Sequence, residues 1–327
     1  MTGRQELAQL SRGLAAIFIS LALSVLTAAA QTAPKTIRLV VPFPPGGTAD
    51  VIARLIGQEA SQISGQSVLV ENRPGAGTVI ATEYVARAAP DGTTLLIMAN
   101  SFVINPSVRA ALPYQPFTFE PICLLVNSPQ VLVVNADSPY KNLAAFVTAA
   151  KARPGELNYA AVGPATTQHI AGEMFKRAAD INLTYVPYAG GAPAVNAILG
   201  GHVTAVLANY NEVKTQLSSG KLRPLAAASR ARIAPLPDVP TMIESGYKDV
   251  EATAWFGMMA PPKTPPETAG QLIALFKSAL AAPEAQSKLT AQGLYPAAAC
   301  GAEFSAHIKQ QYESYARVIK DANIKAE

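Results

Sequence analysis

The chain has 327 residues, of which 50% are hydrophobic and 15% are charged. This balance excludes an intrinsically disordered chain, and the length is sufficient for a protein with two lobes and a sizeable core. The formal net charge of +4 comes from Lys and Arg residues scattered along the sequence, which argues against nucleic-acid binding and suits small anionic ligands better.

The first residues of the chain have the pattern of a secretory signal peptide. Arg4 and Arg12 supply a positive segment, the 13 residues Leu14–Leu26 form an apolar core, and Ala28–Ala30 provide small residues for cleavage before Gln31. An uncleaved membrane anchor is the alternative, but the apolar run is shorter than the roughly 20 residues that span a bilayer. We therefore expect residues 1–30 to be removed and the mature protein to be exported.

Strand-like and helix-like segments alternate along the mature chain, which predicts an α/β protein with mostly parallel sheets. The expected strands are Ile37–Val41, Val68–Glu71, Thr94–Met98, Ile122–Val126, Val131–Asn135, Leu157–Ala161, Leu183–Val186 and Val203–Ala208, with a further apolar run at Leu225–Ala228. The expected helices are Asp50–Gln62, Thr78–Ala88, Leu143–Ala152, Thr167–Ala179 and Pro193–Leu199, with three more after the proline-rich connections PLPDVP and APPKTPP.

The chain has two cysteines, Cys123 and Cys300. In an exported protein a single pair of cysteines favours a disulfide over reactive thiols. Two buried free thiols are the alternative. We expect no metal site, because two distant cysteines and three histidines show no ligand spacing.

Three glycine-containing loops each lead from an expected strand into an expected helix. They are PFPPGGTAD after the first strand, NRPGAGT after the second, and AAVGPATTQH in the middle of the chain. In open α/β sheets, ligands bind where such loops run into helices, and helix N-termini offer unpaired N–H donors and partial positive charge. Three loops of this kind predict an anion-binding cleft between two lobes.

The first loop supplies most of the expected contacts. Gly46 and Gly47 allow the backbone to fold around a carboxylate oxygen, and Thr48 can donate its hydroxyl. We expect Asp50 to cap the helix or brace the loop, because a carboxylate would repel an anionic ligand that carries no amine. Phe43 either packs against the carbon skeleton of the ligand or belongs to the core.

The sequence contains none of the usual enzyme signatures. It has no G-x-S-x-G elbow, no H-E-x-x-H helix and no G-K-[ST] phosphate loop, and NRPGAGTVIA lacks the final glycine of a dinucleotide fingerprint. No histidine has a sequence neighbour that would make it part of a nucleophilic pair. We therefore expect no enzyme activity and no cofactor, with an exported hydrolase as the less favoured alternative.

Several motifs together resemble one family, the periplasmic substrate-binding proteins of tripartite tricarboxylate transporters, known as the Bug family. The motifs are VPFPPGGTADVIARLI, VLVENRPGAGT, PDGTTLLI, NPSV, LPY, KARPGELNYA, GPATTQHIAGEMF, VPYAGGAPAVNAILGGHV, GKLRPLA and LPDVPTMIESGY. The resemblance covers nearly the whole mature chain. It implies a two-lobed periplasmic-binding-protein fold (type II, Venus flytrap), in which each lobe is a central sheet flanked by helices and two crossover strands join the lobes around a small carboxylate.

The sequence also departs from the family pattern in two places. The family commonly has an acidic residue before Phe where this chain reads Thr118 to Pro121, and a Gly-Ser pair where it reads Pro164 to Thr167. The second departure lies in a loop expected to face the ligand. The identity of the ligand is therefore not carried over from the family.

The remaining candidate ligand contacts are spread over both lobes. Each has an alternative: Gly77 and Thr78 could form an ordinary helix cap, His169 could be a packed histidine, and Trp255 is expected in the core or hinge. The candidates beyond the first loop are Gly77, Thr78, Ser101, Thr166, Thr167, His169, Tyr188, Ala189, Gly190 and Asn209.

Together these features predict a periplasmic, monomeric solute-binding protein that captures a small organic carboxylate and delivers it to a membrane permease. Lobe 1 is expected at 31–124 plus 229–327, and lobe 2 at 125–228. A ligand-sensing protein that acts on a membrane sensor kinase is the main alternative, since it would share the fold and differ only in its partner.

Overall fold

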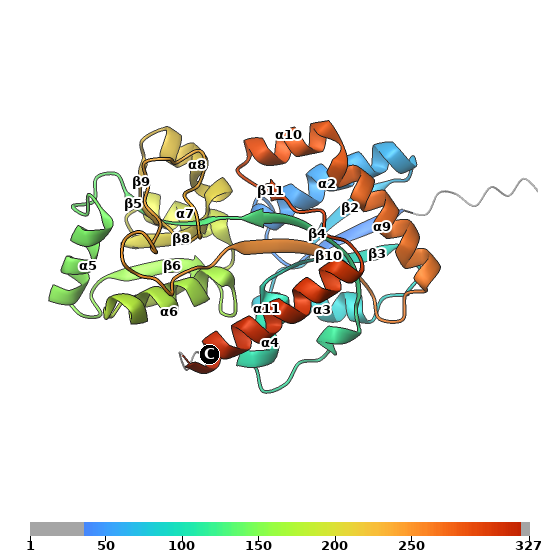
Figure 1. The fold of residues 1–327 in the computed structure, drawn as a ribbon, viewed down its shortest axis with the longest axis horizontal. Helices are drawn as coiled ribbons and strands as arrows, with labels where there is room; N and C mark the ends of the chain where they lie inside the picture. The colour runs from blue at the N-terminus through green and yellow to red at the C-terminus, as the bar shows by residue number, and fades with distance from the viewer. Residues whose placement is uncertain (1–35, 322–327) are drawn as a thin grey trace, which may run out of the picture. The chain divides into compact units, whose positions relative to one another are not determined.

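The computed structural model describes residues 36–321, so the expected signal peptide lies outside the described residues. The described chain contains two β-sheets (Figure 1). Strands of the first sheet are β1 (Ile37–Val41), β2 (Val68–Asn72), β3 (Thr94–Ala99), β4 (Glu120–Ser128), β10 (Ala254–Ala260) and β11 (Tyr295–Pro296). They follow the order β11-β4-β10-β3-β1-β2, with β1 parallel to β2 and β3, and β10 antiparallel to β3 and β4.

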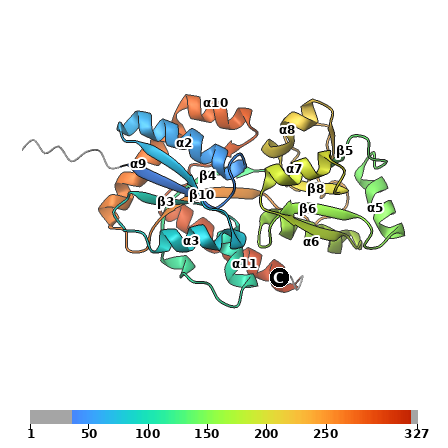
Figure 2. The same ribbon diagram turned by 180° about the vertical axis from the view of Figure 1, so that it is seen from behind.

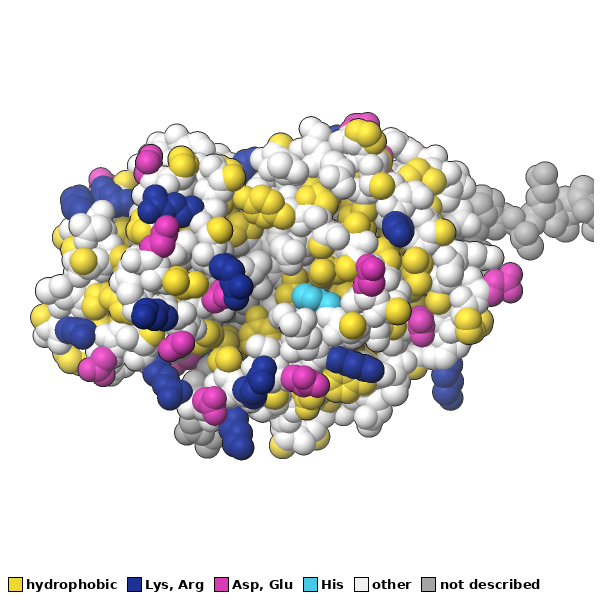
Figure 3. Space-filling view, in the orientation of Figure 1, with side chains coloured by type: hydrophobic (Ala, Val, Ile, Leu, Met, Phe, Trp, Pro, Cys, Tyr) yellow, Lys and Arg dark blue, Asp and Glu magenta, His cyan; other side chains and the backbone are white. Residues whose placement is uncertain are grey.

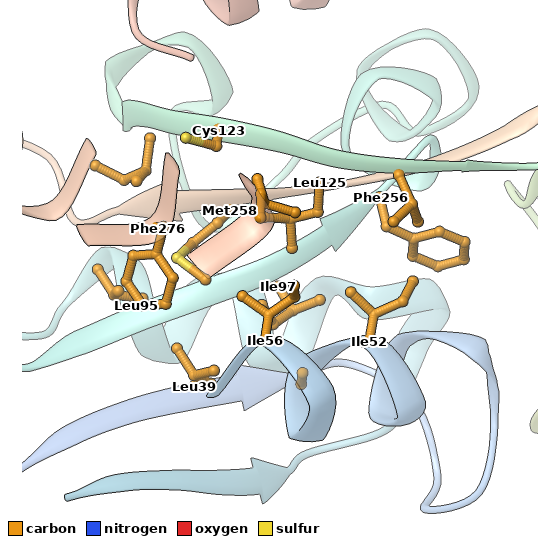
Figure 4. Packing of buried hydrophobic residues seen from close by; sticks show 14 of the residues in the cluster. Leu39, Ile52, Ile56, Leu95, Ile97, Cys123, Leu125, Phe256, Met258 and Phe276 are labelled. Carbon is orange, nitrogen blue, oxygen red and sulfur yellow. The ribbon is translucent and has the colours of Figure 1, made fainter. Parts of the chain in front are cut away.

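Helices cover both faces of the first sheet (Figures 1 and 2). One face carries α2 (Thr48–Ser64), α9 (Pro266–Ala281) and α10 (Pro283–Ala291), and the other carries α3 (Val79–Ala86), α4 (Ser101–Val108) and α11 (Ala302–Asp321). Ile52 and Ile56 lie one turn apart on α2, so both point at the sheet and meet Ile97 and Phe256 in a solvent-free core (Figure 4). This core holds α2, whose N-terminus faces the second sheet, in place.

The second sheet has strands β5 (Gln130–Asn135), β6 (Asn158–Val162), β7 (Thr184–Tyr188), β8 (Ala205–Asn209) and β9 (Leu222–Ala227) in the order β7-β6-β8-β5-β9. β6 is parallel to β7 and β8, while β5 is antiparallel to β8 and β9. Helices α5 (Leu143–Ala152) and α6 (Thr167–Ala179) pack on one face, and α7 (Gly191–Leu199) and α8 (Tyr210–Ser218) on the other. The predicted α/β fold with two helix-flanked sheets is confirmed.

The chain passes between the sheets twice, and both crossings differ from the expected boundaries. β4 continues to Ser128 in the first sheet, and after Pro129 the chain enters β5 of the second sheet. On the way back, residues 229–253 still pack on the second sheet, where Met242 and Val250 are fully buried. The lobe boundaries after residues 124 and 228 stay a prediction, while the chain changes from one sheet to the other at about residues 129 and 253.

Two helices and two strands were absent from the expected elements, namely α4, α8, β10 and the two-residue strand β11. The helix α4 contains Pro106 and the helix α8 is mostly polar, so neither shows a clear apolar stripe. The strand β10, with Trp255 buried in it, follows an irregular segment and is apolar on both faces, because helices cover both sides of the sheet. No helix in residues 36–321 is both long and apolar enough to cross a bilayer.

The two cysteines meet at the edge of the first sheet. Cys123 lies on β4, and Cys300 forms an isolated antiparallel bridge with it just before α11. Their sulfur atoms are bonded as a disulfide across a sequence separation of 177 residues. The bridge ties the C-terminal segment to β4 and therefore to the first sheet.

Candidate functional site

A pocket lies where the loops of the two sheets meet. The first sheet and its helices supply Phe43, Pro44, Pro45, Gly47, Thr48, Ala49, Ala99, Ser101 and Phe256. The second sheet and its helices supply Val162, Thr166, Thr167, Gln168, Gly190, Gly191, Ala192, Pro193, Asn209 and Glu212.

Five helices begin at this pocket. The first turns of α2, α4, α6, α7 and α8 each contribute lining residues, and each helix follows directly on a strand, β1, β3, β6, β7 and β8 respectively. The backbone N–H groups of a first helical turn have no partner within the helix, and the helix dipole makes that end partly positive. The convergence of these ends produces a region suited to anions without any cationic side chain.

The first predicted loop divides into residues that face the pocket and residues that support it. Phe43, Gly47 and Thr48 line the pocket. Gly46 does not, because its N–H donates to Asp50 Oδ2 over 3.0 Å, and its φ of +83° explains why glycine is required there. In this structure Gly46 supports the loop, and its contact with the ligand stays a prediction.

Asp50 braces this loop from below and does not line the pocket. Its carboxylate accepts hydrogen bonds from Arg54 and Asn72, each at 3.0 Å, in addition to the Gly46 N–H. Burial acts to raise the pKa of Asp50, but the hydrogen bonds from Arg54, Gly46 and Asn72 outweigh it and lower the pKa. The N-cap of α2 is Gly47, so of the two expected roles Asp50 has that of a brace.

Thr48 connects the two sheets at the pocket wall. Its hydroxyl oxygen accepts from Asn209 Nδ2 at 2.9 Å and lies 2.9 Å from Asn211 Oδ1 and 3.0 Å from Glu212 Oε1. Thr48 and Asn209 are both almost completely buried. The two expected candidates therefore lie side by side, although 161 residues separate them in the sequence.

Glu212 is the site residue that was not anticipated from the sequence. It is the third residue of α8, and its Oε2 accepts from the backbone N–H of the N-cap residue Asn209 at 3.3 Å, which forms a capping box. Desolvation raises the pKa of Glu212, while hydrogen bonds from Thr48 and Asn209 partly oppose this. The Asn-x-x-Glu spacing directly after the strand Val203–Ala208 was the signal that could have revealed both the helix and this residue.

The second predicted loop supports the pocket without lining it. Gly77 and Thr78 belong to the short 3-10 helix η1 (Ala76–Thr78) and are absent from the lining. Thr78 Oγ1 donates to the hydroxyl of Ser101 over 3.2 Å, and Asn105 donates to the Gly77 carbonyl over 2.9 Å. Ser101 itself lines the pocket, and Gly77 and Thr78 position the start of α4 through these hydrogen bonds. Direct contacts of Gly77 and Thr78 with the ligand stay a prediction.

The third predicted loop begins α6. Thr166 is its N-cap, with its hydroxyl oxygen accepting from the His169 N–H and donating to the carbonyl of Val162. Thr166 and Thr167 line the pocket. His169 lies behind it, stacked on Tyr185 with the ring centroids 4.4 Å apart. The structure thus gives His169 the packed position that was its alternative.

The far wall of the pocket is formed by the start of α7. Gly190 lines the pocket as the N-cap of α7, whereas Tyr188 and Ala189 do not reach it. A Cβ on Gly190 would lie 3.2 Å from Pro44 Cδ, so this glycine also allows the loops of the two sheets to approach each other. The wall of the pocket thus begins at Gly190, two residues after the predicted start at Tyr188, and continues through Gly191 to Pro193.

The electrostatic character of the pocket comes from backbone dipoles and one acidic side chain. Among the described residues that line it, Glu212 is the only charged one. No cluster of potential metal ligands occurs in residues 36–321. On the surface, cationic and anionic side chains are interspersed on the face shown in Figure 3, without a broad area of one sign. The pocket can therefore hold a small anion through N–H and hydroxyl donors.

Comparison with known protein families shows to which family the chain belongs. Residues 52–324 match the model of the tripartite tricarboxylate transporter family receptor, TctC. The chain belongs to this family. The resemblance noted in the sequence is thereby confirmed, and the protein is a solute-binding receptor of the tripartite tricarboxylate transporter type.

Individual members of the TctC family support this assignment over most of the chain. Protein BugT of Bordetella pertussis is 35% identical over 313 residues, which cover 94% of this chain and 96% of BugT. The periplasmic binding protein BugD has a structure with a TM-score of 0.85 and 35% identity, covering 89% of this chain and 99% of that one. A protein of R. palustris with bound adipate has a TM-score of 0.86 and 32% identity, covering 89% and 99%.

Proposed function

We propose that this TctC-family receptor binds a small organic carboxylate in the pocket between its sheets and delivers it to the permease subunits of its transporter. The observation that carries the proposal is the convergence of five helix N-termini on a pocket lined by no cationic side chain. The adipate bound to the R. palustris relative supports the same ligand class.

The donors available to a carboxylate come from both sheets. Thr48, Ser101 and Thr167 carry hydroxyls at the first positions of their helices, where backbone N–H groups also face the pocket. Phe43 and Phe256 provide apolar surface for a carbon skeleton. The residues proposed to contact the ligand are Phe43, Gly47, Thr48, Ser101, Thr166, Thr167, Gly190 and Asn209.

The proposal includes binding without turnover. The pocket lining contains no cysteine and no histidine, and the hydroxyl of Thr166 is engaged by the Val162 carbonyl 2.6 Å away. The lining therefore contains no Ser–His or Cys–His pair. We further propose that the protein is a periplasmic monomer whose signal peptide is cleaved near Gln31, in keeping with Arg4, Arg12 and the apolar core Leu14–Leu26.

Calorimetric titration of the purified mature protein with straight-chain mono- and dicarboxylates of three to six carbons tests the binding. We expect one ligand to bind per chain and to be recovered chemically unchanged. Absence of binding by every member of this series, or recovery of a ligand altered in excess over protein, would contradict the proposal.

The proposed location and assembly are checked separately. Intact mass of protein from the periplasmic fraction should match a chain that begins at or near Gln31, and light scattering should give the mass of one chain. A full-length chain recovered from the membrane fraction would contradict the proposed export.

A further inference from the structure

The acidic side chain in an otherwise uncharged anion pocket calls for a physical explanation. Glu212 lies half-buried at the pocket wall, and its carboxyl group fits against the first residue of α7. A Cβ on Gly191 would lie only 2.1 Å from Glu212 Cδ, so the glycine leaves the space that the carboxyl group fills. The position of this carboxyl is therefore built into the pocket.

The hydrogen bonds of Glu212 come from uncharged donors of two residues, Thr48 and Asn209. Oε1 accepts from the Thr48 hydroxyl at 3.0 Å and from the Thr48 N–H at 3.4 Å, and Oε2 accepts from the Asn209 N–H at 3.3 Å. Charge-assisted bonds are usually about 2.7–2.9 Å long. These three bonds are longer, and no ion pair within residues 36–321 involves Glu212.

A capping role accounts for only half of this arrangement. The capping box explains the contact of Oε2 with Asn209. It does not explain the contact of Oε1 with Thr48, which lies at the start of α2 on the first sheet. Glu244 shows what such a residue does elsewhere in the chain: it accepts from the Thr241 N–H at 2.7 Å, pairs with Arg232 and is exposed to solvent. Glu212 lacks both the cation and the open solvent.

A desolvated carboxyl group without a cation is costly, and a cation brought by the ligand removes that cost. We propose that Glu212 is a specificity-determining residue, which selects carboxylate ligands that carry an ammonium group beside the carboxylate. The inference rests on the proposed carboxylate-binding function of the pocket. It adds the ligand subclass, the α-amino carboxylates.

The spacing of the donors and the acceptor restricts where the ammonium group sits on the ligand. The Thr48 N–H and hydroxyl, which are proposed to bind the carboxylate, lie 3.4 Å and 3.0 Å from Glu212 Oε1. A ligand carboxylate that binds at Thr48 beside Glu212 has its neighbouring carbon next to the glutamate carboxyl group. An ammonium group on that carbon reaches Glu212, whereas one several carbons away does not.

Matched ligand pairs test the inference directly. Succinate and aspartate, glutarate and glutamate, and adipate and 2-aminoadipate each differ by one ammonium group beside a carboxylate. Calorimetric titration of the mature protein should show tighter binding of the amino member in at least one pair. In Glu212→Gln, that preference should fall by about 30-fold or more, the usual effect of removing one partner of a desolvated charge pair.

Two controls separate this effect from loss of structure. Glutamine is accepted at the third position of a capping box, so Glu212→Gln should melt within a few degrees of the wild type. Glu244→Gln makes the same change in a turn outside the pocket, where Thr241 and Glu244 exchange similar hydrogen bonds, and should leave the ligand preference unaltered.

Each result has one meaning. Equal or tighter wild-type binding of the member without the ammonium group overturns the inference and leaves the proposed function intact. An unchanged ligand preference in Glu212→Gln also overturns the inference and leaves the proposed function intact. Failure of every carboxylate to bind either protein contradicts the proposed function itself.

Discussion

The side-chain amide of Asn209 donates a hydrogen bond to the hydroxyl oxygen of Thr48 over 2.9 Å. This bond joins the end of β8 in the second sheet to the start of α2 on the first. The same hydroxyl lies within 3.0 Å of two further oxygens, Asn211 Oδ1 and Glu212 Oε1, but has only one proton to give. Thr48 therefore donates to one oxygen at a time, and a ligand oxygen can take the place of either.

Thr48→Val should weaken carboxylate binding by about 1–3 kcal/mol, because it removes the hydroxyl at nearly constant volume and leaves a charged ligand one donor short. Thr48→Ser, which restores the hydroxyl, should recover most of the affinity. Calorimetric titration of both variants measures the difference. Wild-type affinity in Thr48→Val would remove this hydroxyl from the proposed site.

Asp50→Asn should lower the free energy of unfolding at pH 7 by about 1–3 kcal/mol, since Arg54, Asn72 and the Gly46 N–H share this carboxylate. Because the pKa of Asp50 is lowered by folding from its ordinary value of 3.8, its contribution is fully present above that value and is lost as the pH falls through the folded pKa. The difference between variant and wild type should therefore shrink towards pH 3.

Denaturant unfolding at pH 7 and at pH 3 measures this dependence. The exposed Asp249 provides the control, and Asp249→Asn should have little effect at either pH. A stability difference for Asp50→Asn that is as large at pH 3 as at pH 7 would show that the carboxylate charge does not brace the loop.

Replacement of both Cys123 and Cys300 by alanine should lower the stability by about 2–5 kcal/mol, because the disulfide closes a loop of 177 residues in the unfolded chain. Ligand affinity should hardly change, since neither cysteine lines the pocket. Thermal melts and titration test the two statements. Alkylation under denaturing, non-reducing conditions should add no adduct to the wild type, and two adducts would rule out the bridge.

Gly191→Ala should displace the Glu212 carboxyl group, because the new Cβ would lie 2.1 Å from Glu212 Cδ. Overpacking of this kind costs about 1–3 kcal/mol of stability, and we expect ligand affinity to fall as well. Gly270→Ala is the control: a Cβ on Gly270 of α9 meets nothing within 4 Å, so this variant should be equally or more stable and bind normally. Similar behaviour of the two variants would argue against the observed position of Glu212.

Two helices with clear local signals, α5 and α6, were predicted to the residue. Helix α5 begins after Asn142, whose side chain accepts from the Ala145 N–H, and helix α6 begins after the N-cap Thr166. Their caps and apolar stripes are properties of the local sequence. Helix α8 was not predicted because its sequence is mostly polar. Its start is stabilised by tertiary contacts, in which Asn209 and Glu212 bond to Thr48 at the start of α2.

The sequence by itself determined the strand–loop–helix units and the loops that supply donors, because turn residues, helix caps and apolar periodicity act over a few neighbouring positions. Only the tertiary structure decided which side chains of those loops face the pocket. It turned Thr48 inward and Asp50 towards Arg54, placed His169 on Tyr185, and brought Glu212 to the pocket wall. These side-chain orientations depend on contacts between residues that are distant in the sequence. Local sequence patterns do not indicate which distant side chain fills a given space.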